Sequence, residues 1–180
     1  MTIFTPLTAA TNADRLEVSH ETAYSIAFAA LLPSLADFIE AERDLDEICH
    51  SYDPAYSAWH RDAQVARARL NKLLRHVLGL RVERPEDQPL RRMALLADAM
   101  LKDGAPERPQ YLHRQMKLVF FRQFQVQGFG PTAQSRNAML IQARHLIDAM
   151  MRLPLFDYSP DCAIAPDASA PADDLSPTFF

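Results

Sequence analysis

Thirteen prolines and four glycines divide the 180-residue chain into segments in which apolar residues recur at helical spacing. Nowhere does the sequence show the sustained apolar–polar alternation, bounded by hairpin turns, that is typical of β-strands. The connections between the segments are short, which favours antiparallel packing of neighbouring helices. The pattern therefore predicts an all-α protein, a single-domain bundle of five to six mostly antiparallel helices.

Local signals set the expected bounds of the first helix. Asp14 or Ser19 can cap its start, because short polar side chains accept hydrogen bonds from the free N–H groups of a first turn. The helix is expected to run to about His50. Pro33 interrupts it and is expected either to kink it or to begin a second helix with Ser34 as its N-cap.

The next start signal is Asp53 followed by Pro54, an acidic cap before a proline at the first helical position. This helix is expected to end at Gly79, since glycine adopts the conformation that closes many helices. The remaining helices are expected over residues 90–102, 109–127 and 132–153.

Composition separates the last part of the chain from the rest. Residues 154–180 contain five prolines, five aspartates and no lysine or arginine. Such a segment has too little apolar surface to offset the entropy of ordering. We expect a helical bundle domain over residues 1–153, with a flexible N-terminus at 1–13, and a disordered acidic tail over 154–180. The tail contains Phe179 and Phe180, which could anchor on the body or on a partner, although a frayed chain end is the favoured interpretation.

The charge distribution argues against binding driven by a strong overall field. Removing the five acids of the tail from the total of 23 leaves 18 acidic side chains against 19 basic ones in residues 1–156. A nearly neutral body predicts neither a nucleic-acid binder nor a membrane binder. The sequence shows no secretory signal, and its longest strongly apolar run, residues 23–32, is about half of the ~20 residues that span a bilayer. A cytoplasmic location with no membrane contact is expected.

Two Glu-x-x-His pairs, Glu17 with His20 and Glu47 with His50, have the spacing by which di-iron bundle proteins hold a metal. A helical projection places the second pair on the charged side of its helix, opposite the apolar residues. Such a site also needs glutamates from other helices, yet the last two helices contain a single acid, Asp148. A metal-binding bundle is therefore a second alternative only, and we expect neither a metal ligand nor a cofactor.

Motifs of common enzymes are missing from the sequence. All four glycines fall at expected helix ends, so there is no glycine-rich phosphate loop, and no G-x-S-x-G motif occurs. Cys49 lies on an apolar helix face, where a small core residue is commoner than a nucleophile. Cys49 and Cys162 form neither a C-x-x-C pair nor a disulfide framework. No catalytic residue is expected, and the protein is interpreted as a non-enzyme.

A basic stripe on the helix after Pro54 is the clearest candidate surface. It lies opposite the apolar face of that helix and is followed in sequence by further arginines. Its expected partner-binding residues are Arg61, Arg69, Lys72, Arg75, Arg91 and Arg92. An ordinary solvated helix face is the favoured interpretation of the stripe, and a third is that the acidic tail folds back on it.

A nucleic-acid-binding regulator is the first alternative, using the same 61–92 stripe. The last helix begins after a glycine-containing turn and carries Gln134, Arg136 and Asn137 in its first turns. Side chains of these types read base edges when they lie at the start of a recognition helix. A polar first turn is equally typical of any surface helix, so nucleic acid is possible but not favoured.

The helix over 111–126 is apolar on nearly every side, which predicts a central helix or an oligomer interface. The leading interpretation is thus a small cytoplasmic helical-bundle protein that acts by binding, as an interaction or regulatory protein. Its expected partner is another protein or a second copy of itself, in a homo-oligomer.

Overall fold

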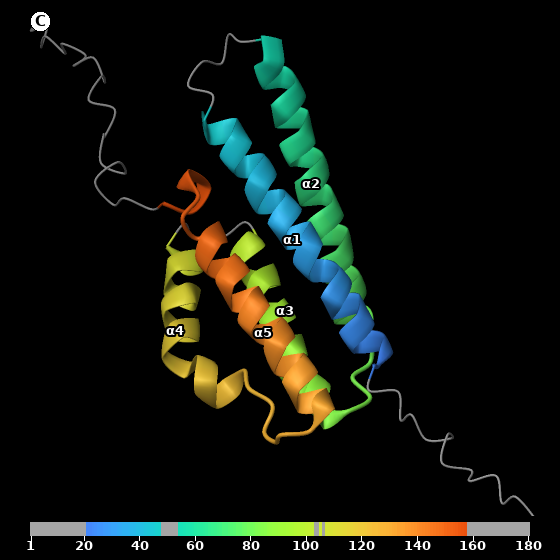
Figure 1. The fold of residues 1–180 in the computed structure, drawn as a ribbon. Coiled ribbons are helices and arrows are strands. Elements are labelled where there is room, and N and C mark those ends of the chain that lie inside the picture. The colour runs from blue at the N-terminus through green and yellow to red at the C-terminus, as the bar shows by residue number, and fades with distance from the viewer. Residues whose placement is uncertain (1–20, 48–53, 103–104, 106, 158–180) are drawn as a thin grey trace, which may run out of the picture.

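The computed structural model describes residues 21–47, 54–102, 105 and 107–157. These residues form five α-helices and two short 3₁₀ helices, with no β-strand among them, and consecutive helices run in opposite directions (Figure 1). The all-α prediction is confirmed. The elements are α1 (Ala23–Glu47), α2 (Pro54–Gly79), η1 (Pro85–Asp87), α3 (Gln88–Leu101), α4 (Arg108–Gln123), α5 (Pro131–Met150) and η2 (Pro154–Phe156).

Helix α1 begins with a reciprocal cap that the sequence analysis missed. The Ser25 backbone N–H donates to Thr22 Oγ1 at 3.1 Å, and the Thr22 backbone N–H donates to Ser25 Oγ at 2.9 Å. Each side chain thus satisfies a backbone donor that the first turn leaves free, as in a capping box. The two residues proposed as caps, Asp14 and Ser19, lie outside the described residues.

Proline 33 does not divide the first helix. It lies inside the continuous α1 on its exposed side. The Ser34 side chain is buried and its Oγ has no hydrogen-bond partner among the described residues, so Ser34 caps nothing. Of the two expected outcomes at Pro33, a new helix with Ser34 as its N-cap is therefore wrong.

The bounds of α2 match the predicted start at Pro54 and end at Gly79, whereas α4 ends at Gln123, earlier than expected. The side chain of Asn137, on α5, explains the early end. Its Oδ1 accepts from the Val126 backbone N–H at 2.8 Å, and its Nδ2 donates to the Val126 carbonyl at 3.0 Å. Val126 thus makes its backbone hydrogen bonds across to α5 instead of continuing α4.

The beginning of the predicted tail is corrected at residues 154–156. These residues form η2, and the Phe156 side chain is buried against the body. Composition alone missed this short apolar turn because prolines and aspartates surround it. The rest of the predicted disordered tail, from residue 158, and the predicted flexible N-terminus at 1–13 lie outside the described residues.

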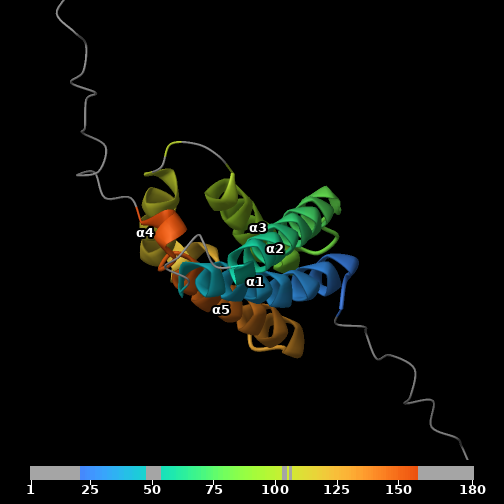
Figure 2. The ribbon, with the colours of Figure 1, turned by 90° about the horizontal axis from the view of Figure 1, so that it is seen from above.

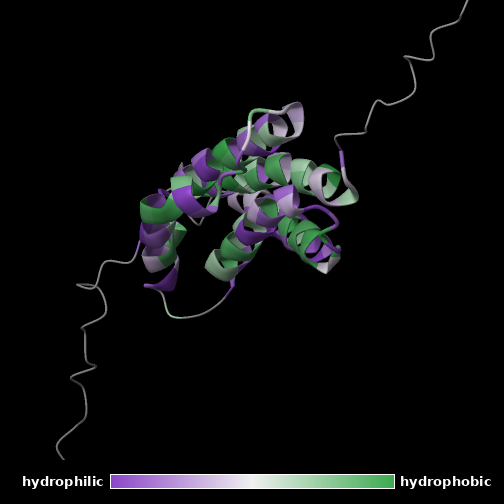
Figure 3. Ribbon diagram, turned by 90° about the horizontal axis from the view of Figure 1, so that it is seen from below, coloured by the Kyte–Doolittle hydropathy of each residue, from purple (hydrophilic) through white to green (hydrophobic). Residues whose placement is uncertain are grey.

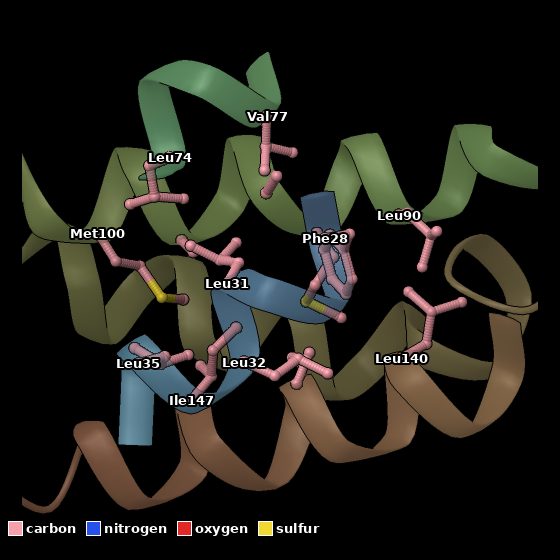
Figure 4. Close-up of a cluster of buried hydrophobic side chains, with 14 of the residues drawn as sticks. Phe28, Leu31, Leu32, Leu35, Leu74, Val77, Leu90, Met100, Leu140 and Ile147 are labelled. Carbon is pink, nitrogen blue, oxygen red and sulfur yellow. The ribbon is translucent and has the colours of Figure 1, made fainter. Parts of the chain in front are cut away.

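The core lies where α1 meets α2, α3 and α5. Hydrophobic and hydrophilic residues alternate along the helices (Figure 3), and each of the five helices contributes buried apolar side chains to the core. Figure 4 shows side chains of these four helices converging on one cluster. The labelled members are Phe28, Leu31, Leu32 and Leu35 of α1, Leu74 and Val77 of α2, Leu90 and Met100 of α3, and Leu140 and Ile147 of α5.

Among the described helices, α1 alone is long and apolar enough to cross a membrane by length and composition. The apolar run at 23–32 that the sequence analysis measured is only part of this helix. Half of the apolar stretch is buried inside the protein, and the core helix of a soluble protein passes the same test. Because α1 packs against both α2 and α5, its length and hydropathy are explained by its place in the core.

Candidate functional site

Helix α4 lies at one side of the molecule, away from α2, in both views of the fold (Figures 1 and 2). Its solvent-facing side, called here the outer face of α4, consists of Tyr111, Arg114, Leu118, Phe121 and Arg122, all exposed. The spacing of these residues places them along one side of a helix. Leu118 is 75% exposed, Phe121 66% and Tyr111 58%, so three large apolar side chains lie in solvent along a single helix.

The opposite side of α4 holds the helix to the body. Met116 and Phe120 are buried in the core, and His113 Nε2 lies 2.6 Å from Asp148 Oδ1 on α5. At the first turn of α4, Gln110 Nε2 donates to the Phe156 carbonyl at 3.0 Å. These contacts fix which side of α4 faces solvent.

Arginine 144 of α5 adds a further contact at the edge of the outer face. Its Cζ lies 4.8 Å from the Phe120 ring centroid and 5.6 Å from that of Phe121. A guanidinium at this distance is attracted to the face of an aromatic ring. Phe121 is therefore oriented by the body although most of its surface is exposed.

All formally charged side chains of α4 are basic. Its basic residues are Arg108, Arg114, Lys117 and Arg122, and the sequence contains no Asp or Glu from residue 108 to 147. Two acids lie near the helix: the exposed Glu107 directly precedes it, and Asp148 of α5 contacts His113 and has Lys117 Nζ at 3.7 Å. The outer face is thus both apolar and basic, a combination that suits an acidic segment with apolar side chains.

The predicted basic stripe is divided between two helices. Arg61, Arg69, Lys72 and Arg75 are exposed on α2, as expected, whereas Arg91 and Arg92 belong to α3. Several of these side chains already have partners within the protein. Arg69 Nη1 lies 3.3 Å from Asp37 Oδ2, Arg75 Nε donates to the Asn71 carbonyl at 3.3 Å, and Arg92 Nη1 donates to the Gln123 carbonyl at 3.0 Å.

A groove of about 680 Å³ lies beside this stripe, between the C-terminal ends of α2 and α3. Arg75 and Leu78 line it from α2, and Asp98 and Lys102 from the α3 side. Lys102 Nζ and Asp98 Oδ2 pair at 2.6 Å. The two charges therefore largely neutralise each other, and the groove offers no set of free polar groups converging on a ligand.

The residues proposed to read nucleic-acid bases are engaged inside the protein. Arg136 is fully buried and its Nε donates to Asp87 Oδ1 at 2.8 Å. The Asn137 side chain hydrogen-bonds both the N–H and the carbonyl of Val126, and Gln134 Nε2 donates to the Phe129 carbonyl at 3.0 Å. In this structure Arg136 and Asn137 cannot reach a base edge, because the contacts that hold α5 use their polar atoms.

A buried polar cluster forms around Asp87, and the sequence analysis missed it. Thr22 Oγ1 donates to Asp87 Oδ2 at 2.6 Å, while Arg136 pairs with the other carboxylate oxygen. Tyr24 lies nearby, and its own burial raises its pKa to about 12, against an opposing effect of Arg91 and with a smaller upward effect of Asp87. The spacing of Arg136 with the buried Ala133, Leu140 and Ala143 of α5 was the signal that it points inward.

The two Glu-x-x-His pairs cannot be placed. Glu17, His20 and His50, with the Glu47 side chain, lie outside the described residues. Within the described part of the chain, no group of three or more His, Cys, Asp or Glu side chains could hold a metal ion.

Comparison of the chain with protein-family models, with curated proteins and with solved structures gave no match.

Proposed function

We propose that this protein acts by binding another protein, as a cytoplasmic interaction or regulatory protein, and that the outer face of α4 is its binding surface. The observation that carries the proposal is the row of Tyr111, Leu118 and Phe121 in solvent on one side of a helix that the core holds in place. Single exposed apolar residues are normal, but several aligned on one face are typical of protein–protein contacts. Aromatic residues and arginine are also the types that contribute most to such contacts.

Self-association is part of this proposal, and charge restricts its geometry. Two α4 outer faces placed against each other would bring Arg114 and Arg122 of one copy close to those of the other, with no acid on α4 to offset them. Like charges across an interface are unfavourable. The contact between copies therefore joins α4 of one copy to a different, acidic region of the second, and it weakens as salt screens the charges.

The proposal can be tested with Leu118→Glu, measured by light scattering over a range of protein concentrations. The parent protein is expected to increase in average mass with concentration, and L118E to remain monomeric because it places a charge in the apolar row. Val65→Glu on α2 is the matched control, since Val65 is 61% exposed and lies outside this face.

Two results would contradict the proposal. A parent protein that stays monomeric at every concentration would remove self-association from it. Equal loss of association in L118E and V65E would show that the outer face of α4 has no special role.

A further inference from the structure

The chain leaves the described body beside α4. Phe156 is buried, and its carbonyl accepts the hydrogen bond from Gln110 in the first turn of α4. Asp157 follows directly and is exposed. Residues 158–180 are therefore tethered at one end of the outer face of α4.

The composition of this segment complements that face in charge. Residues 158–180 contain four aspartates and no lysine or arginine, whereas α4 contains four basic residues and no acid. The aspartates are Asp161, Asp167, Asp173 and Asp174. Opposite charges brought together by a short tether attract more effectively than the same charges on separate molecules, because the tether fixes a high local concentration.

The segment also complements the face in apolar character. It contains Leu175, Phe179 and Phe180 close to two of its aspartates. Tyr111, Leu118 and Phe121 offer exposed apolar surface on α4. Burial of aromatic side chains in such a contact contributes favourable free energy beyond the charge attraction.

The tether is long enough for the two to meet. A 16-residue helix such as α4 is about 24 Å long at 1.5 Å per residue. A chain of 23 residues can span up to about 75 Å when extended. Residues 158–180 can therefore follow the whole of α4 from their attachment point and still place their aromatic side chains on it.

The basic stripe of α2 is a poorer match for the same segment. It faces acidic neighbours, as the ion pair of Arg69 with Asp37 shows, and Asp62 lies on α2 itself. The nearby carboxylates offset part of the positive charge there. Near α4 the carboxylates are Glu107 and Asp148, and among the described residues neither forms an ion pair with Arg114 or Arg122 of the outer face.

From these observations we infer that residues 158–180 bind the outer face of α4 in the same molecule. The inference rests on the proposed function of that face as a binding surface, and it identifies residues 158–180 as the segment that binds there. Because a second copy would need the same surface, the bound segment limits self-association. Neutralising its aspartates exposes the face and strengthens association.

The experiment uses the full chain with a nitroxide spin label introduced by Thr178→Cys, near the far end of the segment, because a label close to Asp157 would stay near α4 without any binding. Cys49→Ser and Cys162→Ser remove the two native thiols, and circular dichroism verifies that this variant keeps its helices. Amide signals of residues 111–122 are expected to lose more than half of their NMR intensity when the label is paramagnetic. The loss should disappear in about 1 M salt, where the Debye length falls to about 3 Å.

The matched variants distinguish the two basic surfaces. Arg114→Glu with Arg122→Glu should abolish the intensity loss, and Arg61→Glu with Lys72→Glu on α2 should leave it unchanged. Intensity loss on α2 in place of α4, or none at all, overturns the inference. A further control mixes spin-labelled molecules without the isotope with isotope-labelled molecules without the spin label. Intensity loss on α4 in this mixture would also overturn the inference, because the contact would then be intermolecular.

A second measurement keeps this inference distinct from the proposed function. A variant that combines Asp161→Asn, Asp167→Asn, Asp173→Asn and Asp174→Asn should have a higher average mass by light scattering than the parent at the same concentration. Association that depends on Leu118 but is unchanged by these Asp→Asn substitutions would overturn the inference while leaving the proposed function intact. If no variant associates but the intensity loss on α4 is observed, only the self-association part of the proposed function would be contradicted.

Discussion

Asp87 and Arg136 form an ion pair in which both side chains are fully buried, with Arg136 Nε 2.8 Å from Asp87 Oδ1. Thr22 donates to the second carboxylate oxygen of Asp87. Thr22 directly precedes α1, Asp87 directly precedes α3, and Arg136 lies in the second turn of α5. These three helices run in the same direction (Figure 1). Because helix N-termini carry partial positive charge, the Asp87 carboxylate is favourably placed where three of them meet. The cluster therefore connects the N-terminal ends of these three helices.

Replacing Asp87 by Ala is expected to lower the free energy of unfolding by about 3–5 kcal/mol, because it leaves the buried Arg136 guanidinium without this carboxylate. Urea unfolding followed by circular dichroism measures the change. The double variant D87L/R136M is the control and should recover most of the loss, since an apolar pair of similar volume leaves no buried charge. A loss below about 1 kcal/mol in D87A would contradict the importance given to this pair.

Thr22 should be sensitive to the loss of its hydroxyl and insensitive to the loss of its methyl group. Thr22→Val removes both the cap of α1 and the hydrogen bond to Asp87, at an expected loss of about 1–3 kcal/mol in unfolding free energy. Thr22→Ser retains both and should stay close to the parent. Thermal unfolding of the two variants side by side gives the comparison, and equal destabilisation would show that packing of the methyl group matters more than the hydroxyl.

The helices themselves could be predicted from sequence because their boundaries are encoded locally. Pro54 marks the start of α2 by its own backbone preference, and Pro131 begins α5 for the same reason. Gly79 ends α2 at the predicted position, but without the positive φ expected of a closing glycine. The early end of α4 could not be predicted this way. It depends on the Asn137 side chain reaching Val126 from another helix, and sequence spacing carries no information about that contact.

The candidate nucleic-acid-binding residues were predicted less well, because polar side chains near a helix start were assumed to be exposed. Arg136 was expected at a nucleic-acid surface because it is charged and lies near a helix start, yet it is buried. An arginine enters a core only where a carboxylate from elsewhere meets it, and Asp87 is 49 positions away in sequence. The apolar character of α4 was recognised, but which of its apolar residues remain in solvent depends on how α3 and α5 pack against it.

Tyr24 should make stability depend on alkaline pH. Burial raises its pKa from 10.0 to about 12 in the folded protein. Between these values the unfolded chain releases the phenol proton while the folded protein keeps it, so folding stability is fully present below about pH 10 and falls as the pH rises towards 12. Urea unfolding at a series of pH values should show this decline in the parent.

The variant Tyr24→Phe isolates the contribution of this phenol. Its unfolding free energy should decline less above pH 10 than that of the parent, and Tyr111→Phe, at an exposed tyrosine, should decline as the parent does. At neutral pH, Y24F should be as stable as the parent or slightly more stable. The Tyr24 hydroxyl is buried with no hydrogen-bond partner among the described residues, so its removal leaves no partner unsatisfied. Parallel pH curves for the parent and Y24F would contradict the assignment.

Phe120 and Leu118 are two positions apart on α4 and should respond oppositely to truncation. Phe120 is 1% exposed and stacks on Phe124 with 6.0 Å between ring centroids, so Phe120→Ala should lower the unfolding free energy by about 3–5 kcal/mol. Leu118 is 75% exposed, so Leu118→Ala should change it by no more than about 0.5 kcal/mol. Guanidinium unfolding at a protein concentration low enough to keep the chain monomeric measures both. A loss of more than about 1 kcal/mol in L118A would mean that Leu118 is covered within the molecule. If the loss persists at about 1 M salt, where residues 158–180 should be released, the body itself covers Leu118, and the outer face of α4 lacks the exposed apolar residue on which its proposed binding most depends.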